Sequence, residues 1–138
     1  MKAKDVQYVT VEEAIVIHDD QIDRYGGGDG LFDEGRKLEA AIMAVQATWD
    51  GEPLIRSLAE IAAAYVVYIS TSHPFFDGNK RTSLAVALSF LDAHGYRDEL
   101  GSFGDWEEIV VQVACGRIDQ DALAQFFAAH MGDWGGLT

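Results

Sequence analysis

Residues 57–96 read SLAEIAAAYVVYISTSHPFFDGNKRTSLAVALSFLDAHGY and hold the most apolar part of the chain. Only five of them are charged at neutral pH, and three of those are Asp77, Lys80 and Arg81. A segment that is apolar nearly throughout is typical of the buried centre of a globular protein. We therefore expect this stretch to form the core, and we expect the three clustered charges to have a chemical role.

Two helices are predicted within this stretch. Ser57 begins a capping box, and the run after it is apolar on nearly every side, as in a central helix. Pro74 disfavours helical geometry at the residue before it, so the first helix should end near His73. Asn79 can cap the second helix, and Gly95 can stop it. The clustered charges then lie in the turn between the two helices.

The sequence on either side predicts four further helices, each with a polar capping residue and an apolar stripe at helical spacing. Their expected starts are Thr10, Asp33, Asp105 (with Glu108) and Asp119, and their expected ends are near Tyr25, before Asp50, at Gly116 and at Gly132. The stripe of the second of these is Leu38, Ala41, Ile42, Val45 and Trp49. The GGGDG run at residues 26–30 predicts a turn, and residues 46–56 could form a short hairpin.

The expected fold is all-α, a compact bundle of about six helices in one domain that spans residues 1–138. Residues 133–138 are expected to be a loose tail. An apolar content of 49% is enough for one sizeable core and excludes a long disordered segment.

The chain has 23 acidic and 10 basic residues and a formal net charge of −13. That charge repels nucleic-acid backbones and anionic membranes, so we expect no direct binding to either. The longest apolar run, Ile61 to Ile69, is far shorter than the roughly 18 residues that a membrane span needs. The first fourteen residues lack the apolar core and cleavage site of a secretory signal, so none is expected there, and the single cysteine, Cys115, agrees with a reducing compartment. We therefore expect a cytoplasmic protein.

The turn at residues 73–81 brings together three kinds of chemistry-bearing group. Gly78 to Arg81 lie at a predicted helix N-terminus, where unpaired backbone N–H groups and two cations favour a bound phosphate. Asp77 offers the hard oxygen that Mg²⁺ prefers when it bridges protein and nucleotide. His73 is suited to accept a proton near neutral pH. Together they predict transfer of a phosphate-containing group to a hydroxyl.

A plainer interpretation is open for each residue taken alone. Asp77 and Arg81 could form a surface ion pair, and His73 could simply close a helix. A Walker phosphate loop is excluded, because Pro74 stands where its first glycine is required. The second class of function is a non-catalytic module that holds a nucleotide or an acidic peptide on the same cationic turn.

The motif HPFFDGNKR at residues 73–81 resembles the signature of the Fic/Doc superfamily, and the chain as a whole resembles its death-on-curing (Doc) branch. The resemblance extends over VEEAIVIHDDQIDRYGG at residues 11–27, GLFDEGRKLEAAIMAVQA at 30–47 and TSLAVALSFLDAHGY at 82–96. It implies a small all-helical bundle, which matches the fold expected above.

In Fic adenylyltransferases the motif is similar to HPFxxGNGRxxR, whereas here Lys80 replaces the second glycine and Leu84 the last arginine. The resemblance implies that these changes disturb the seat for the inner phosphates, so that ATP binds in reverse and donates its terminal phosphate. It thus implies a Doc-like kinase toxin that phosphorylates a threonine of elongation factor Tu and stops translation. Pro74 and Gly78 look more like Fic, so AMP transfer remains the alternative.

The resemblance also implies roles and partners. By position, His73 is the general base, Asp77 the magnesium ligand, and Gly78, Asn79, Lys80 and Arg81 the phosphate-binding turn. The family's usual restraint is a Phd-like antitoxin in a type II toxin–antitoxin system. By the same resemblance, residues 46–56 could be the flap that aligns a target peptide, with Trp49 and Arg56 as weak candidates for contact.

Three further residues are expected to have structural roles and no part in the chemistry. His18 lies on the apolar face of the first helix and is expected to be a hydrogen-bonded core residue that ties down the corner at residues 24–27. Phe75 is expected to anchor the turn in the core and orient His73. Cys115 is expected to be a buried, small apolar residue.

Overall fold

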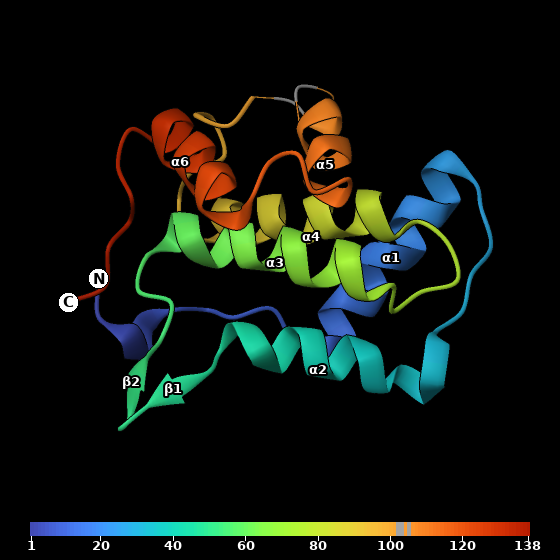
Figure 1. The fold of residues 1–138 in the computed structure, drawn as a ribbon, viewed down its shortest axis with the longest axis horizontal. Helices are drawn as coiled ribbons and strands as arrows, with labels where there is room; N and C mark the ends of the chain where they lie inside the picture. Colours follow the sequence, from blue (N-terminus) through green and yellow to red (C-terminus); the bar gives the residue numbers. More distant parts are fainter. Residues whose placement is uncertain (102–103, 105) are drawn as a thin grey trace.

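The computed structural model describes residues 1–101, 104 and 106–138. Its α-helices are α1 (Val11–Tyr25), α2 (Arg36–Val45), α3 (Leu58–Ser72), α4 (Asn79–Ala93), α5 (Glu107–Ala114) and α6 (Gln120–Met131). Two short 3-10 segments, Ala3–Asp5 and Phe32–Gly35, and a ribbon of β1 (Thr48–Trp49) and β2 (Glu52–Pro53) complete the described part of the chain. Figure 1 confirms the all-α prediction. The expected start of the fifth helix at Asp105 lies outside the described residues.

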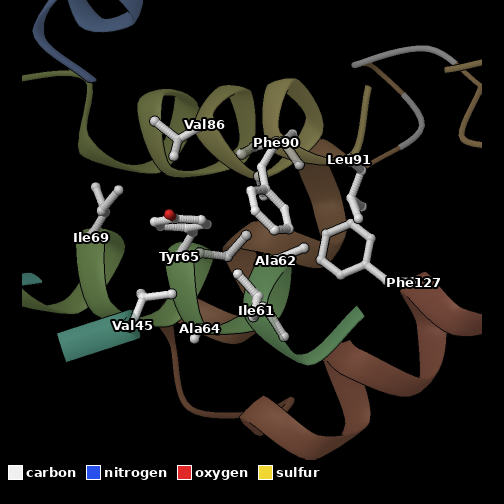
Figure 2. Close-up of a cluster of buried hydrophobic side chains, with 14 of the residues drawn as sticks. Val45, Ile61, Ala62, Ala64, Tyr65, Ile69, Val86, Phe90, Leu91 and Phe127 are labelled. Carbon is white, nitrogen blue, oxygen red and sulfur yellow. The ribbon is translucent and has the colours of Figure 1, made fainter. Parts of the chain in front are cut away.

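Helix α3 is the centre of the molecule. It packs most extensively against α4, and also against α6 and α2, so it is covered on several sides (Figure 1). Ten of its fifteen residues are buried, as its apolar composition predicts. In the core shown in Figure 2, Tyr65 and Ile61 of α3 face Phe90 and Leu91 of α4, with Phe127 of α6 beside them. The two halves of the opening sequence stretch therefore pack against each other as a helical hairpin.

The hydroxyl of Tyr65 provides a stability test of this core. It accepts a hydrogen bond from the backbone N–H of Val9 over 2.9 Å, and the burial that makes this bond strong also raises the pKa of Tyr65. Tyr65→Phe should lower the free energy of unfolding by about 1–3 kcal/mol, because it leaves a buried N–H without a partner. Urea unfolding measures the change. Tyr68→Phe, at a half-buried position of the same helix, is the control and should change little.

Three of the predicted helix caps are confirmed by the structure. Thr10 caps α1, Ser57 caps α3 and Asp119 caps α6, each by accepting a backbone N–H bond in the first turn. The prediction that Asp33 caps the second helix is wrong. Asp33 adopts a left-handed conformation with φ 55°, and α2 begins only at Arg36, whose side chain bonds the Asp33 carboxylate.

The predicted hairpin at residues 46–56 is present. Thr48 pairs with Pro53 and Trp49 with Glu52. The expectation that Trp49 continues the apolar stripe of α2 is wrong, because the helix ends at Val45 and Trp49 is 77% exposed on β1. The remaining stripe residues, Leu38, Ala41, Ile42 and Val45, are buried as predicted.

Residues 134–138 are bonded to the body of the protein, contrary to the loose tail expected for 133–138. The carbonyls of Trp134 and Gly135 accept hydrogen bonds from the N–H groups of Ala59 and Leu58. The first N–H groups of a helix lack partners within it, so this segment completes the start of α3. The side chain of Leu137 is buried, and Thr138 bonds Met1, which brings the two termini together (Figure 1).

Two smaller expectations concern membranes and Cys115. None of the described helices is long and apolar enough to span a membrane. Cys115 was expected to be buried, but it is exposed because it lies just beyond the last turn of α5.

Candidate functional site

The turn between α3 and α4 begins at His73. This residue follows the last turn of α3 in the left-handed conformation, φ 51° and ψ 60°, and its side chain is exposed. The left-handed residue ends the helix, and Pro74 follows it as the sequence predicts. Phe75 is buried and anchors the turn, whereas Phe76 is 60% exposed. The turn therefore holds the imidazole of His73 at the surface while its middle is fixed in the core.

Asn79 braces this turn from within. Its Oδ1 accepts the backbone N–H of Phe75, and its Nδ2 donates to the carbonyl of the same residue, both over 2.9 Å. The N-cap position of α4 is occupied by Gly78 rather than by Asn79. Gly78 has φ 76°, a conformation that favours glycine. The amide side chain that the sequence assigns to phosphate thus shapes the turn around it.

The carboxylate of Asp77 is held by two backbone donors. Oδ1 accepts the N–H of Gly78 over 2.8 Å, and Oδ2 accepts the N–H of Gly28 over 3.2 Å. The bond from Gly28 lowers the pKa of Asp77 most, followed by the bond from Gly78, with a smaller contribution from the positive charge of Arg81. The side chain is exposed, so the carboxylate is an oriented anion with lone pairs left for a further partner.

The lowered pKa of Asp77 predicts a dependence of stability on pH. The ionised form is favoured in the fold, so its stabilisation is fully present above the ordinary value of 3.8 and is lost as the pH falls through the lower folded value. The difference in unfolding free energy between the wild type and Asp77→Asn should be constant above about pH 5 and should shrink below the ordinary pKa. Urea unfolding at several pH values measures it. A difference that stays constant down to pH 2.5 would contradict the lowered pKa.

The glycine run at residues 26–30 lies against this turn. The Gly30 carbonyl accepts the N–H of Phe76 over 3.2 Å, and the Pro74 carbonyl accepts the N–H of Phe32 over 2.9 Å. A side chain on Gly27, at φ 117°, would come within 2.7 Å of the Asp77 carboxylate. The run is therefore more than a flexible turn, since the lack of a side chain at Gly27 allows the backbone to pack on Asp77.

Two cations lie at the start of α4. Lys80 is exposed, and the guanidinium carbon of Arg81 lies 4.7 Å from the centre of the Tyr25 ring. The first helical hydrogen bond of α4 joins the Thr82 N–H to the Gly78 carbonyl. The N–H groups at the start of the helix, before Thr82, therefore have no partner within it. Among the ion pairs of the described residues, none joins Arg81 to Asp77. The surface ion pair between Asp77 and Arg81 that the sequence left open is therefore absent.

The motif turn and the start of α4 open onto one cavity of about 500 Å³. The residues assigned to the site from the sequence all line this cavity: His73, Asp77, Gly78, Asn79, Lys80 and Arg81. The sequence analysis missed the other lining residues, which are Phe76, Leu84, Glu107, Val110 and Val111. The volume is within the range of small-molecule sites. One wall is cationic and the other is mainly apolar, with a single carboxylate.

The apolar wall was missed because α5 supplies most of it. Glu107, Val110 and Val111 come from a helix separated from the motif by about two dozen residues, and no local pattern connects them to it. The hairpin at residues 46–56 is not part of the site. It precedes the N-terminus of α3, whereas His73 follows the C-terminus of that helix (Figure 1). The fifteen residues of α3 give the helix a length of about 22 Å. The segment that contacts the motif turn is residues 27–32.

The donor set at Asp77 fits magnesium that arrives with a nucleotide. Among the described residues, no cluster of three or more His, Cys, Asp or Glu side chains could hold a metal ion by itself. Mg²⁺ is commonly held by one or two carboxylates together with substrate phosphates. A single oriented carboxylate beside a cationic helix start meets that requirement.

The fold and the site define a mostly helical protein with a cavity, lined by Lys80 and Arg81, at the turn between its two central helices. The sequence matches the Fic/DOC family over residues 8–91, more than half of the chain. It is 38% identical over 119 residues to "Protein kinase doc" of Escherichia phage P1, which covers 86% of this chain and 91% of the phage protein. It is 34% identical over 101 residues to "Toxin Doc" of Mycolicibacterium smegmatis, with 72% and 77% covered. The chain belongs to the Fic/Doc family, in its Doc branch.

Proposed function

We propose that this protein is a Doc-like toxin that acts as an ATP-dependent protein kinase. The observation that carries the proposal is the cavity in which His73, the Asp77 carboxylate and the cationic start of α4 meet. Base, anion and cationic seat are the parts that phosphoryl transfer to a hydroxyl requires. The similarity to a protein named as a kinase supports this reaction class.

The roles of the residues follow from their places in the cavity. His73 would take the proton of the attacking hydroxyl, since its exposed side chain lies at the open edge of the motif turn. Lys80, Arg81 and the first backbone N–H groups of α4 would bind the phosphates. Asp77 would hold Mg²⁺, which supplies charge neutralisation for the phosphates when it is bound. Asn79 would keep the turn in shape through its two bonds to Phe75.

The reaction forms a bond between the target hydroxyl oxygen and the γ-phosphorus and breaks the bond to the β–γ bridging oxygen, with ADP as the leaving group. Lys80 supports γ-phosphate transfer over AMP transfer, because it stands where the adenylyltransferase motif has glycine. The apolar wall of Leu84, Val110 and Val111 gives the nucleoside a surface to pack against.

The proposed target is a threonine of elongation factor Tu, which would connect the chemistry to a block of translation, and the proposed restraint is a Phd-like antitoxin. Both proposals rest on membership of the Doc branch and on the relative named as a toxin. ATP and Mg²⁺ are the proposed cofactors. The residues 1–138 are proposed to act as one domain.

Transfer of differently labelled ATP to purified elongation factor Tu tests the proposal. Label from γ-labelled ATP should be retained on the factor in the presence of Mg²⁺, and label from α-labelled ATP should not. Label retained only from the α position would replace the kinase by an AMP transferase. Absence of both labels, together with growth arrest that persists in a His73→Ala variant, would favour the non-catalytic binding module.

A further inference from the structure

His18 is a buried imidazole beneath the motif turn, and the proposed chemistry does not use it. It belongs to the middle of α1, and only 1% of its surface is exposed. The sequence predicts that it ties down the corner at residues 24–27. In the structure it contacts the motif turn instead.

Two contacts fix the ring. Its Nε2 lies 2.8 Å from the backbone carbonyl oxygen of Asp77, and its plane stacks on Phe75 with 3.8 Å between ring centres and 3° between planes. A carbonyl oxygen can only accept, so Nε2 carries the proton and donates. Gly78 lies against the same ring, since a Cβ there would be in ordinary van der Waals contact with Nε2, at 3.6 Å.

The Asp77 carbonyl and the Gly78 N–H belong to one peptide unit. That unit is planar and trans, so its C=O and N–H groups point in opposite directions. His18 holds the carbonyl down toward α1, and the N–H therefore points away from α1. There it donates to Oδ1 of the Asp77 side chain over 2.8 Å. The orientation of the carboxylate thus depends on the bond that His18 makes to the backbone of the same residue.

We infer that His18 is a positioning residue that orients the Asp77 carboxylate for its cation by fixing the peptide plane between Asp77 and Gly78. The inference rests on the proposed role of Asp77 as the magnesium ligand. Partners that orient a metal ligand typically contribute about 10- to 100-fold to metal affinity. The bond donor, and not the bulk of the ring, is the property that matters.

Two variants separate the donor from the bulk. His18→Phe keeps a flat ring to stack on Phe75 but has no donor, whereas His18→Gln has an amide nitrogen near the position of Nε2 but cannot stack. ATP binding is measured by calorimetry across a series of Mg²⁺ concentrations for both variants and the wild type. The half-saturating Mg²⁺ concentration should rise at least about tenfold in His18→Phe and less than about threefold in His18→Gln.

Equal shifts in both variants, or no shift in His18→Phe, would overturn the inference. A second measurement uses the wild type alone, so it does not depend on the folding of any variant. Long-range ¹H–¹⁵N spectra should show the His18 proton on Nε2, and a ring without a proton on Nε2 would also overturn the inference.

Failure of the proposed function has a different signature. A wild type that binds no ATP at any Mg²⁺ concentration would refute the proposed nucleotide site. The amide proton shift of Gly78 then decides the inference. It should move in His18→Phe and stay near the wild-type value in His18→Gln, because only the former releases the peptide plane. An unmoved shift in His18→Phe would overturn the inference.

Discussion

Replacing His73 by asparagine is expected to abolish group transfer while leaving the fold intact. His73 is exposed and has a left-handed backbone, φ 51°, which asparagine tolerates better than most residues. Asparagine cannot take a proton from the target hydroxyl. General base catalysis contributes about 10²- to 10⁴-fold, so the initial rate of phosphate transfer at saturating ATP and Mg²⁺ should fall by that factor.

His130→Asn is the matched control for this change. His130 is also exposed, but it lies in the last turn of α6 and bonds the carbonyl of Phe126, and it does not line the cavity. Its replacement should leave the transfer rate unchanged. A His73→Asn protein that retains more than about a tenth of the wild-type rate would remove the base from the proposed mechanism.

Asp77→Asn is expected to raise the Mg²⁺ concentration needed for half-maximal transfer by about 100-fold or more. Loss of a residue that only orients a ligand costs about 10- to 100-fold in metal affinity, and Asp77 is the proposed ligand itself. The amide has nearly the same shape and can still accept one of the two backbone N–H bonds. The loss of charge is therefore the main change, and a titration of the transfer rate with Mg²⁺ measures it.

Asp121→Asn controls for the general effect of removing one negative charge from an acidic protein. Asp121 is exposed in the first turn of α6 and lies outside the cavity of about 500 Å³. Its replacement should leave the Mg²⁺ dependence unchanged. The same modest shift in both variants would point to the net charge and not to a ligand at Asp77.

Local signals predicted most helix boundaries. The caps at Ser57 and Asp119 depend only on residues within one turn, so the sequence contains the whole interaction. Asp33 has the same type of side chain, yet it does not cap a helix. Leu31, two residues before Asp33, forms an antiparallel bridge with Phe75, which places the chain before α2 in a path that a local pattern does not encode.

The composition of the site was predictable, but its surroundings were not. The motif placed the imidazole of His73, the carboxylate of Asp77 and two cations within nine consecutive residues, and these four side chains line one cavity. The wall from α5 and the bond from His18 involve residues distant in sequence. The flap that the resemblance implies at residues 46–56 lies before the N-terminus of α3, whereas the motif turn follows the C-terminus of that helix. Nearness in sequence to the motif helix therefore did not mean nearness to the motif.

The sequence by itself determined the helices and the chemical groups of the motif, because helical periodicity, capping and proline or glycine breaks act within a few residues. Only the tertiary structure decided how Asp77 is held. Its backbone carbonyl bonds His18 of α1 and its carboxylate bonds the N–H of Gly28 in the following loop, and these partners lie 59 and 49 residues away in the chain. Such contacts form only when the packing of α1 against α4 brings these segments together, since no local pattern specifies which distant donor meets which acceptor.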